Sequence, residues 1–139
     1  MWSKTYSKRV AGVTLDKVWQ VWTDVNQWHS WQTDIEYAKL EGEFKVGNSI
    51  SMQLKDGPKV AFEIVSVAPG QEFTDVTRFP GARMFDCHEL IAHGDEVEIR
   101  TTIQVRGFLG FLWRKLVAEN VANGMAAQTD ALIEKARHA

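Results

Sequence analysis

The sequence predicts an α+β domain in which a curved antiparallel sheet of seven strands surrounds a long C-terminal helix. Three observations support this prediction. An early segment has helical spacing of apolar residues, a middle section alternates in short runs broken by turn residues, and the stretch from Gly110 to Arg137 is helical in spacing with no proline. With 139 residues the chain suits one domain, so we expect residues 1–139 to fold as a single unit.

The N-terminal part predicts one strand followed by two short helices. Residues 2–11 are rich in strand-forming side chains. In the span 12–32, Thr14 offers a helix N-cap, and apolar residues follow at helical spacing: Leu15, Val18, Trp19 and Trp22. Thr23 is placed to cap a second short helix.

The section from about residue 34 to 106 predicts six strands joined as a meander. Its alternating runs are separated by turn signals at Val46-Gly47-Asn48, Asp56-Gly57-Pro58, Pro69-Gly70, Pro80-Gly81 and Gly94-Asp95. Turn residues spaced in this way are typical of antiparallel hairpins.

The final segment predicts one helix from about Gly110 to Arg137. Its length corresponds to about 40 Å at 1.5 Å per residue. Gly124 is its one internal glycine, which either makes room for a ligand or lets the helix pack closely on the sheet. Large apolar residues recur at helical spacing: Leu109, Leu112, Trp113, Leu116, Val117, Val121, Met125, Leu132 and Ile133.

The predicted hairpins assign three polar residues to an otherwise apolar sheet face. A turn centred on Gly94-Asp95 pairs His88 with Thr101, and one at Pro80-Gly81 brings Asp75 opposite Asp86. Two carboxyl groups so close are not both comfortably ionised, so one gains a proton or a cation lies between them. His88 is the nearest partner. Such a cluster indicates a site, although buried Asp and His side chains also serve purely structural hydrogen bonds.

Composition excludes several classes of function. The net charge is −2, which favours neither nucleic-acid nor anionic-membrane binding, and we read the small basic group of Arg106, Arg114 and Lys115 as a solvated face. The chain contains no run of about 18 apolar residues, so the sequence predicts no membrane-spanning helix. A single cysteine, Cys87, and the lack of a signal-like N-terminus predict a cytoplasmic protein.

The sequence predicts no metal site and no cofactor. His88-Glu89 followed by His93 has one residue too many for the zinc-helix signature, and in a strand the two histidines point to opposite faces. No glycine-rich phosphate loop precedes a helix.

Several motifs together resemble the START-like (SRPBCC) superfamily, which includes polyketide cyclases and related lipid-binding proteins. The similar residues are Val18-Trp19, Thr23-Asp24, Trp28 and Trp31, a strand ending at Gly42, Val46-Gly47, Gly94-Asp95, and Gly107 through Leu109. The resemblance implies the helix-grip fold, in the order one strand, two helices, six strands and one helix. It also implies a cavity between the sheet and the last helix.

We expect the chain to bind a small apolar or aromatic molecule, such as a polyketide, quinone or lipid, in that cavity. The candidate ligand-binding residues come from both walls of the cavity: Phe62, Phe73, Met84, Thr101, Trp113, Leu116, Asn120 and Gly124. We expect a monomer or a homodimer.

Two other functions remain open. In the first, the chain is a cyclase- or dehydratase-type enzyme, with His88 as general base and Asp75 or Asp86 as acid or as modulator of its pKa. In the second, it is a protein-interaction or regulatory module, although the sequence offers no exposed patch for a partner.

Overall fold

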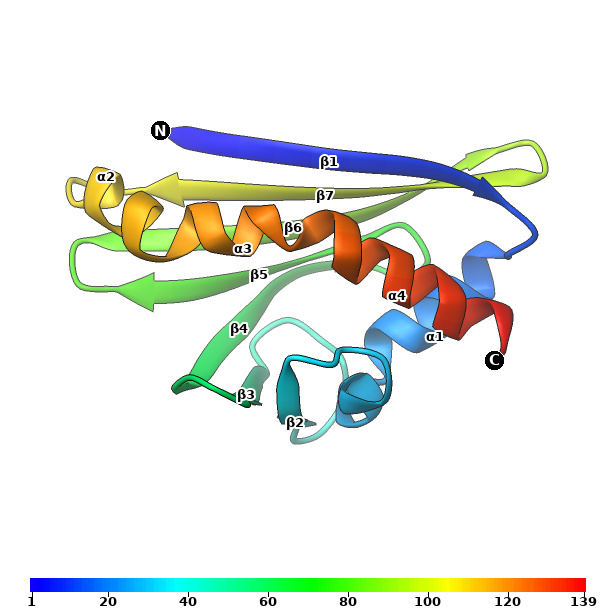
Figure 1. The fold of residues 1–139 in the computed structure, drawn as a ribbon, viewed down its shortest axis with the longest axis horizontal. Helices are drawn as coiled ribbons and strands as arrows, with labels where there is room; N and C mark the ends of the chain where they lie inside the picture. Colours follow the sequence, from blue (N-terminus) through cyan, green and yellow to red (C-terminus); the bar gives the residue numbers. More distant parts are fainter.

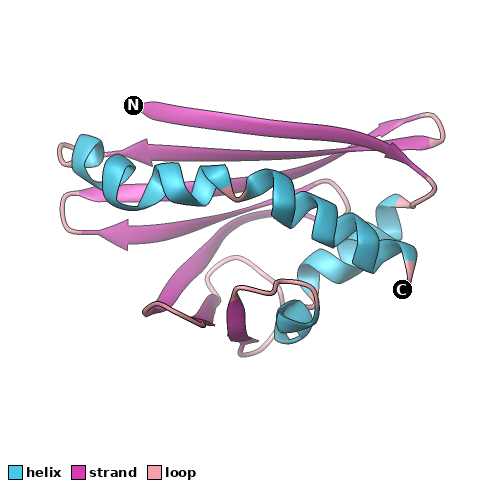
Figure 2. Ribbon diagram, viewed as in Figure 1, coloured by secondary structure: helices cyan, strands magenta, loops and turns pink.

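The computed structural model describes residues 1–139 and contains one open sheet of seven antiparallel strands. The strand order across the sheet is β1-β7-β6-β5-β4-β3-β2, so the first strand pairs with the last and the others form a meander. Figure 1 shows the sheet curving around the C-terminal helix, and in Figure 2 the helices gather on one side of the sheet. The strands are β1 (Trp2–Ala11), β2 (Ile35–Leu40), β3 (Ser49–Leu54), β4 (Lys59–Ala68), β5 (Glu72–Phe79), β6 (Ala82–His93) and β7 (Glu96–Arg106).

The predicted element order and α+β helix-grip class are confirmed, and so are the two short helices. Helix α1 (Leu15–Thr23) begins where the Thr14 hydroxyl accepts a hydrogen bond from the backbone N–H of Lys17. The 3₁₀ helix η1 (Val25–Ser30) follows, but the predicted cap by Thr23 is wrong. The Thr23 hydroxyl donates instead to the Trp19 carbonyl oxygen, because Thr23 still belongs to the last turn of α1.

The C-terminal helix is continuous in direction but not uniform. It comprises α2 (Gly110–Trp113), the π-helical turn η2 (Arg114–Ala118), α3 (Glu119–Asn123) and α4 (Met125–Arg137), with an interruption at Gly124. An ion pair links α4 to β1, with Lys8 Nζ 2.6 Å from Asp130 Oδ1. No helix of the structure combines the length and apolar character that crossing a bilayer requires.

The strand register confirms the predicted faces. His88 pairs with Thr101 across β6 and β7, and Asp75 pairs with Asp86 across β5 and β6. Register shifts occur in β2 between Ile35 and Tyr37 and in β4 between Ile64 and Ser66. These shifts lie away from the β5–β6–β7 hairpins, so the parity of the central strands is preserved.

The helix covers only part of the concave face. A smaller core cluster lies under η2 and α3, where Ala118, Ala122 and Met125 pack against residues of β6 and β7. A larger cluster joins α4 and α1 to residues of all seven strands through the side chains of Leu132, Ile133 and Ala136. Between these clusters, α3 reaches no apolar core residue of β3 or β4.

The turn between β5 and β6 packs tightly on the start of the helix. The backbone N–H of Leu109 donates to the Gly81 carbonyl oxygen at 3.0 Å. Gly107 has φ +120°, and a Cβ atom there would lie 2.5 Å from the same oxygen, so only glycine fits without strain.

Candidate functional site

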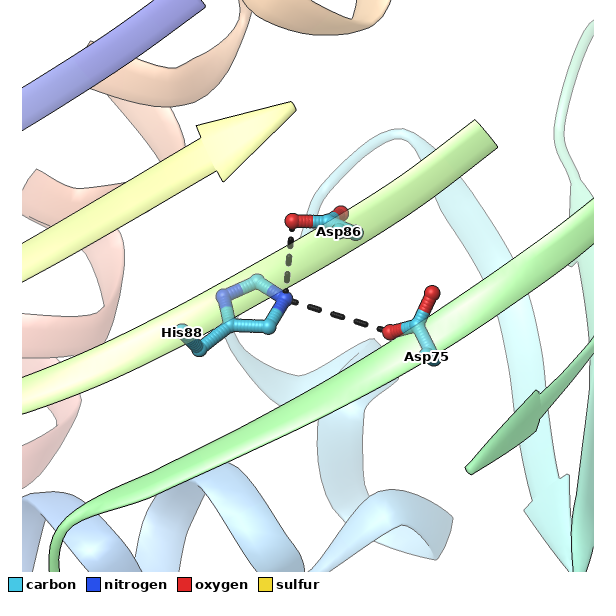
Figure 3. Close-up of side chains that lie close together, drawn as sticks. All are labelled: Asp75, Asp86 and His88. Atoms are coloured by element: carbon cyan, nitrogen blue, oxygen red, sulfur yellow. Dashed lines mark ion pairs between the residues drawn. The ribbon is translucent and has the colours of Figure 1, made fainter. Parts of the chain in front are cut away.

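Three polar side chains meet on the concave face, as the strand alternation predicts. Asp75 extends from β5, and Asp86 and His88 extend from β6 (Figure 3). The Nε2 atom of His88 lies 3.1 Å from Asp86 Oδ1 and 3.9 Å from Asp75 Oδ2. One imidazole nitrogen therefore faces both carboxyl groups.

Aromatic packing fixes the plane of the His88 imidazole. Phe73 stacks on it with ring centres 4.4 Å apart, and Trp22 meets it edge-on at 5.2 Å. His88 is 7% exposed, and its Nδ1 atom has no hydrogen-bond partner. A buried imidazole nitrogen without a partner costs free energy, which makes this position unusual for a purely structural histidine.

The two carboxyl groups differ in their surroundings. Asp75 is 5% exposed, and burial raises its pKa well above the ordinary value, with a further contribution from the nearby Asp86 charge. The Asp86 side chain is 21% exposed, so it is the member of the cluster that solvent or a ligand reaches most easily. Asp86 Oδ1 also lacks a partner with hydrogen-bond geometry, despite its contact with His88.

The cluster can act chemically in two ways. A protonated Asp75 beside an imidazole and a second carboxylate forms an acid–base group. The same three side chains offer one ligand atom each, all within 4.8 Å of one another, which is the spacing that a single cation needs.

Among the predicted ligand-binding residues, those of the strands all face inward. Phe73 is almost fully buried and packs against Trp19, Trp22 and Phe44, and therefore belongs to the core. Thr101 and Met84 are also buried, while Phe62 remains half-buried and stacks on Trp28.

The ligand-binding residues predicted on the C-terminal helix differ in burial, with Trp113 partly buried and the other three exposed. Trp113 stacks on Phe79 with ring centres 4.4 Å apart, and its indole N–H donates to the Pro80 carbonyl oxygen. It therefore anchors the helix to the β5–β6 turn. Leu116, Asn120 and Gly124 are exposed.

The prediction that Gly124 lets the helix pack closely on the sheet is wrong, because Gly124 does not face the sheet. A Cβ atom at Gly124 would meet only backbone oxygens of its own helix, those of Val121 and Asn120. The sheet-facing positions are taken instead by Ala122 and Met125.

The exposed helix residues border the uncovered part of the concave face. The Gln128 amide donates to the side-chain oxygen of Gln32, which lies between η1 and β2. Asn120 and Gly124 precede Gln128 at intervals of four residues and therefore lie along the same side of the helix. Opposite them, inward-facing residues of β3 to β5 stay half-buried: Met52, Val60, Phe62 and Thr77.

Two hollows lie outside this region, and sequence reasoning did not find them. One of about 410 Å³ lies between β1 and the helix, lined by Trp2, Lys4, Arg114, Glu119, Ala122 and Asn123. Another of about 260 Å³ is lined by Ser30, Trp31, Ala131, Glu134, Lys135 and His138. Neither includes a predicted site residue, and no sequence motif marks either one.

Comparison with known proteins supports the same fold. A family model described as "Polyketide cyclase / dehydrase and lipid transport" matches residues 1–137. A search of curated proteins finds no match.

Solved structures of similar fold share little sequence with this chain. A hypothetical protein of Helicobacter pylori is 16% identical with a TM-score of 0.76, covering 97% of this chain and 88% of its own. Norcoclaurine synthase of Thalictrum flavum, in complex with dopamine and hydroxybenzaldehyde, is 15% identical with a TM-score of 0.70, covering 94% and 84%. TTHA0849 of Thermus thermophilus is 12% identical with a TM-score of 0.72, covering 97% of each chain.

Proposed function

Since the chain belongs to the polyketide cyclase / dehydrase and lipid transport family, we propose that it binds a small apolar or aromatic molecule on the concave face. One observation supports this most strongly: the Asp75–Asp86–His88 cluster lies on an otherwise apolar face whose β3–β5 part the helix leaves half-exposed. An apolar surface with a few convergent polar groups is the usual character of a ligand site.

The residues then divide into contact and support roles. Phe62 and Leu116 supply apolar contact, and Asp86 with the exposed Asn120 amide fixes polar groups of the ligand. Phe73, Met84, Thr101 and Trp113 lie behind this surface and hold it in shape. Because Gly124 has no side chain, the helix surface next to Asn120 leaves room for the ligand.

Native mass spectrometry of the purified protein tests the proposal directly. We expect a co-purified small molecule, or saturable binding of the apolar fluorophore 1-anilinonaphthalene-8-sulfonate by the folded protein. Replacing Phe62 with Ser should weaken fluorophore binding, whereas the matched control Val46→Ser, an exposed apolar residue of the β2–β3 loop, should leave it unchanged. Equal affinities for the two variants would refute the proposal.

Acid–base catalysis is the second candidate, and it is favoured by the raised pKa of the buried Asp75 carboxyl group close to His88. The reaction class is proton abstraction beside a carbonyl group, followed by ring closure or loss of water, with His88 as base and the carboxyl groups as its partners. A poly-β-ketone substrate tests this candidate. His88→Gln should abolish turnover while fluorophore binding persists, and an unchanged pH–rate profile would rule out His88 as the base.

We also propose that the protein works as a monomer or homodimer in the cytoplasm, where a free cysteine such as Cys87 stays reduced. A regulatory role through a protein partner gains support only if a stoichiometric partner is isolated with the concave face empty.

A further inference from the structure

One end of the molecule exposes large apolar side chains. Phe108, in the turn after β7, is 82% exposed, and Phe111 and Leu112 in α2 are 69% and 41% exposed. In Figure 1 this end lies at the left, where α2 sits beside the end of β7 and the β5–β6 turn. We call Phe108, Phe111 and Leu112 the apolar end patch. Isolated exposed apolar residues are common, but three neighbouring ones indicate a contact surface.

Basic residues outnumber acidic ones at the same end. The chain has no Asp or Glu between Glu98 and Glu119, and none from Val76 to Phe85, although its net charge is −2. The strand register places Arg78 beside Arg83, and Arg83 beside Arg106, in a row across β5, β6 and β7. Like charges in adjacent strands repel one another, so this row is best stabilised by an external anion.

Two arginines of this row have no acidic partner. Arg78 pairs with Glu63, but Arg83 and Arg106 both lie over the Phe85 ring, at 5.6 Å and 5.3 Å from its centre. This packing holds the arginine side chains in place, and neither guanidinium group forms an ion pair, although that of Arg106 donates a hydrogen bond to the Gln104 side-chain oxygen. Lys115, exposed one turn into the helix, also forms no ion pair.

We propose that this end of the molecule docks on the surface of an anionic lipid bilayer. Phe108 and Phe111 enter the boundary between headgroups and acyl chains, and Arg83, Arg106 and Lys115 contact the lipid phosphates. A bilayer fits better than an acidic protein or an RNA, because it accepts protruding aromatic side chains without requiring a complementary pocket. The inference is independent of the ligand proposed for the concave face.

Co-sedimentation of the full chain with vesicles tests the proposal. We expect binding to vesicles of phosphatidylcholine mixed with phosphatidylserine, weaker binding to phosphatidylcholine alone, and a loss of affinity as salt is raised. Replacing Phe108 and Phe111 together with Ser should lower the affinity at least ~10-fold. Replacing Arg83 and Arg106 with Gln should lower it about fivefold for each arginine.

Matched controls come from exposed residues elsewhere on the chain. Val46→Ser and the pair Lys45→Gln with Lys135→Gln change apolar and basic surface in the β2–β3 loop and at the end of α4, away from the apolar end patch, and should bind like the native protein. Circular dichroism and thermal melting confirm that each variant folds. Because the substituted side chains are exposed, we expect melting temperatures close to the native one.

Two results would overturn the proposal. The first is absence of binding to phosphatidylserine vesicles. In that case a dimer in light scattering that the Phe108 and Phe111 substitutions dissociate would identify a second copy as the occupant, and poly(U) binding that the arginine substitutions abolish would identify an RNA. The second is equal binding by the patch variants and their controls. The Phe62→Ser variant separates the two proposals. It should lose fluorophore binding and keep vesicle binding, because Phe62 belongs to the ligand site and not to the apolar end patch.

Discussion

Replacement of Asp75 by Asn should stabilise the protein at neutral pH, although it removes a polar residue of the candidate site. Burial and the neighbouring Asp86 charge raise the pKa of Asp75. The unfolded chain loses this proton as pH rises above about 3.8, while the folded chain keeps it up to the raised pKa. The free energy of unfolding therefore falls across that pH window, and an uncharged amide avoids the loss.

The size of the effect can be bounded from the geometry. Two ionised carboxylates no more than 4.8 Å apart repel by ~3 kcal/mol at an effective dielectric constant of 20, before desolvation is added. Holding a proton instead of this repulsion costs at most ~4 kcal/mol at pH 7 for a carboxyl group of ordinary pKa 3.8, which sets the upper bound. We therefore expect Asp75→Asn to raise the free energy of unfolding by about 1 to 4 kcal/mol at pH 7.

Urea unfolding followed by tryptophan fluorescence measures this difference, and pH is the decisive variable. The gain should shrink toward zero near pH 3.8, grow as pH rises from there to the raised pKa of Asp75, and level off above it. Asp34→Asn, at an exposed carboxylate, is the matched control and should change little at any pH. A gain independent of pH, or a destabilised Asp75→Asn protein, would refute the account of Asp75 as a buried, strained acid.

Other substitutions test the fold. Gly107→Ala should lower the free energy of unfolding by more than ~2 kcal/mol, because its Cβ would collide with a backbone oxygen, whereas Gly12→Ala, at φ +80° in open space, should cost only ~1 kcal/mol in urea titrations. Gly124→Ala should raise it by about 0.5 to 1 kcal/mol, and a decrease would show that a bare backbone is needed there. The Ser7 hydroxyl, helped by His93 and Arg100, lowers the pKa of Glu98 to about 2. The contribution of ionised Glu98 to stability is present above pH 4.5 and lost as pH falls toward 2. Glu98→Gln should therefore make the melting temperature less dependent on pH in this acid range.

The central hairpins were predictable because their turns preserve parity. Pairing of Asp75 with Asp86, and of His88 with Thr101, follows from the positions of Pro80-Gly81 and Gly94-Asp95 and from the alternation of side chains along a strand. The register shift between Ile64 and Ser66 was not predictable, since no local residue in β4 marks a bulge.

The course of the helix across the sheet depends on tertiary packing, which spacing alone does not reveal. The apolar positions predicted a helix, yet they did not show that Trp113 would bond to the Pro80 carbonyl oxygen and hold the helix over β6 and β7. That placement leaves Leu116 and Asn120 exposed. Whole-chain charge was similarly uninformative, because a net charge of −2 averages over an end at which Arg83, Arg106 and Lys115 have no acidic partner.

The pairing of the first strand with the last has a consequence for folding. The hairpins from β2 to β7 join neighbours in the chain and can form locally, but Trp2 pairs with Val105 and Ala11 with Glu96. During synthesis the first ten residues of the sheet therefore wait, without a partner strand, until nearly the whole polypeptide has emerged. Closing this one seam is the largest single loop-closure cost in the sheet, so we expect β1 to join the sheet late in folding.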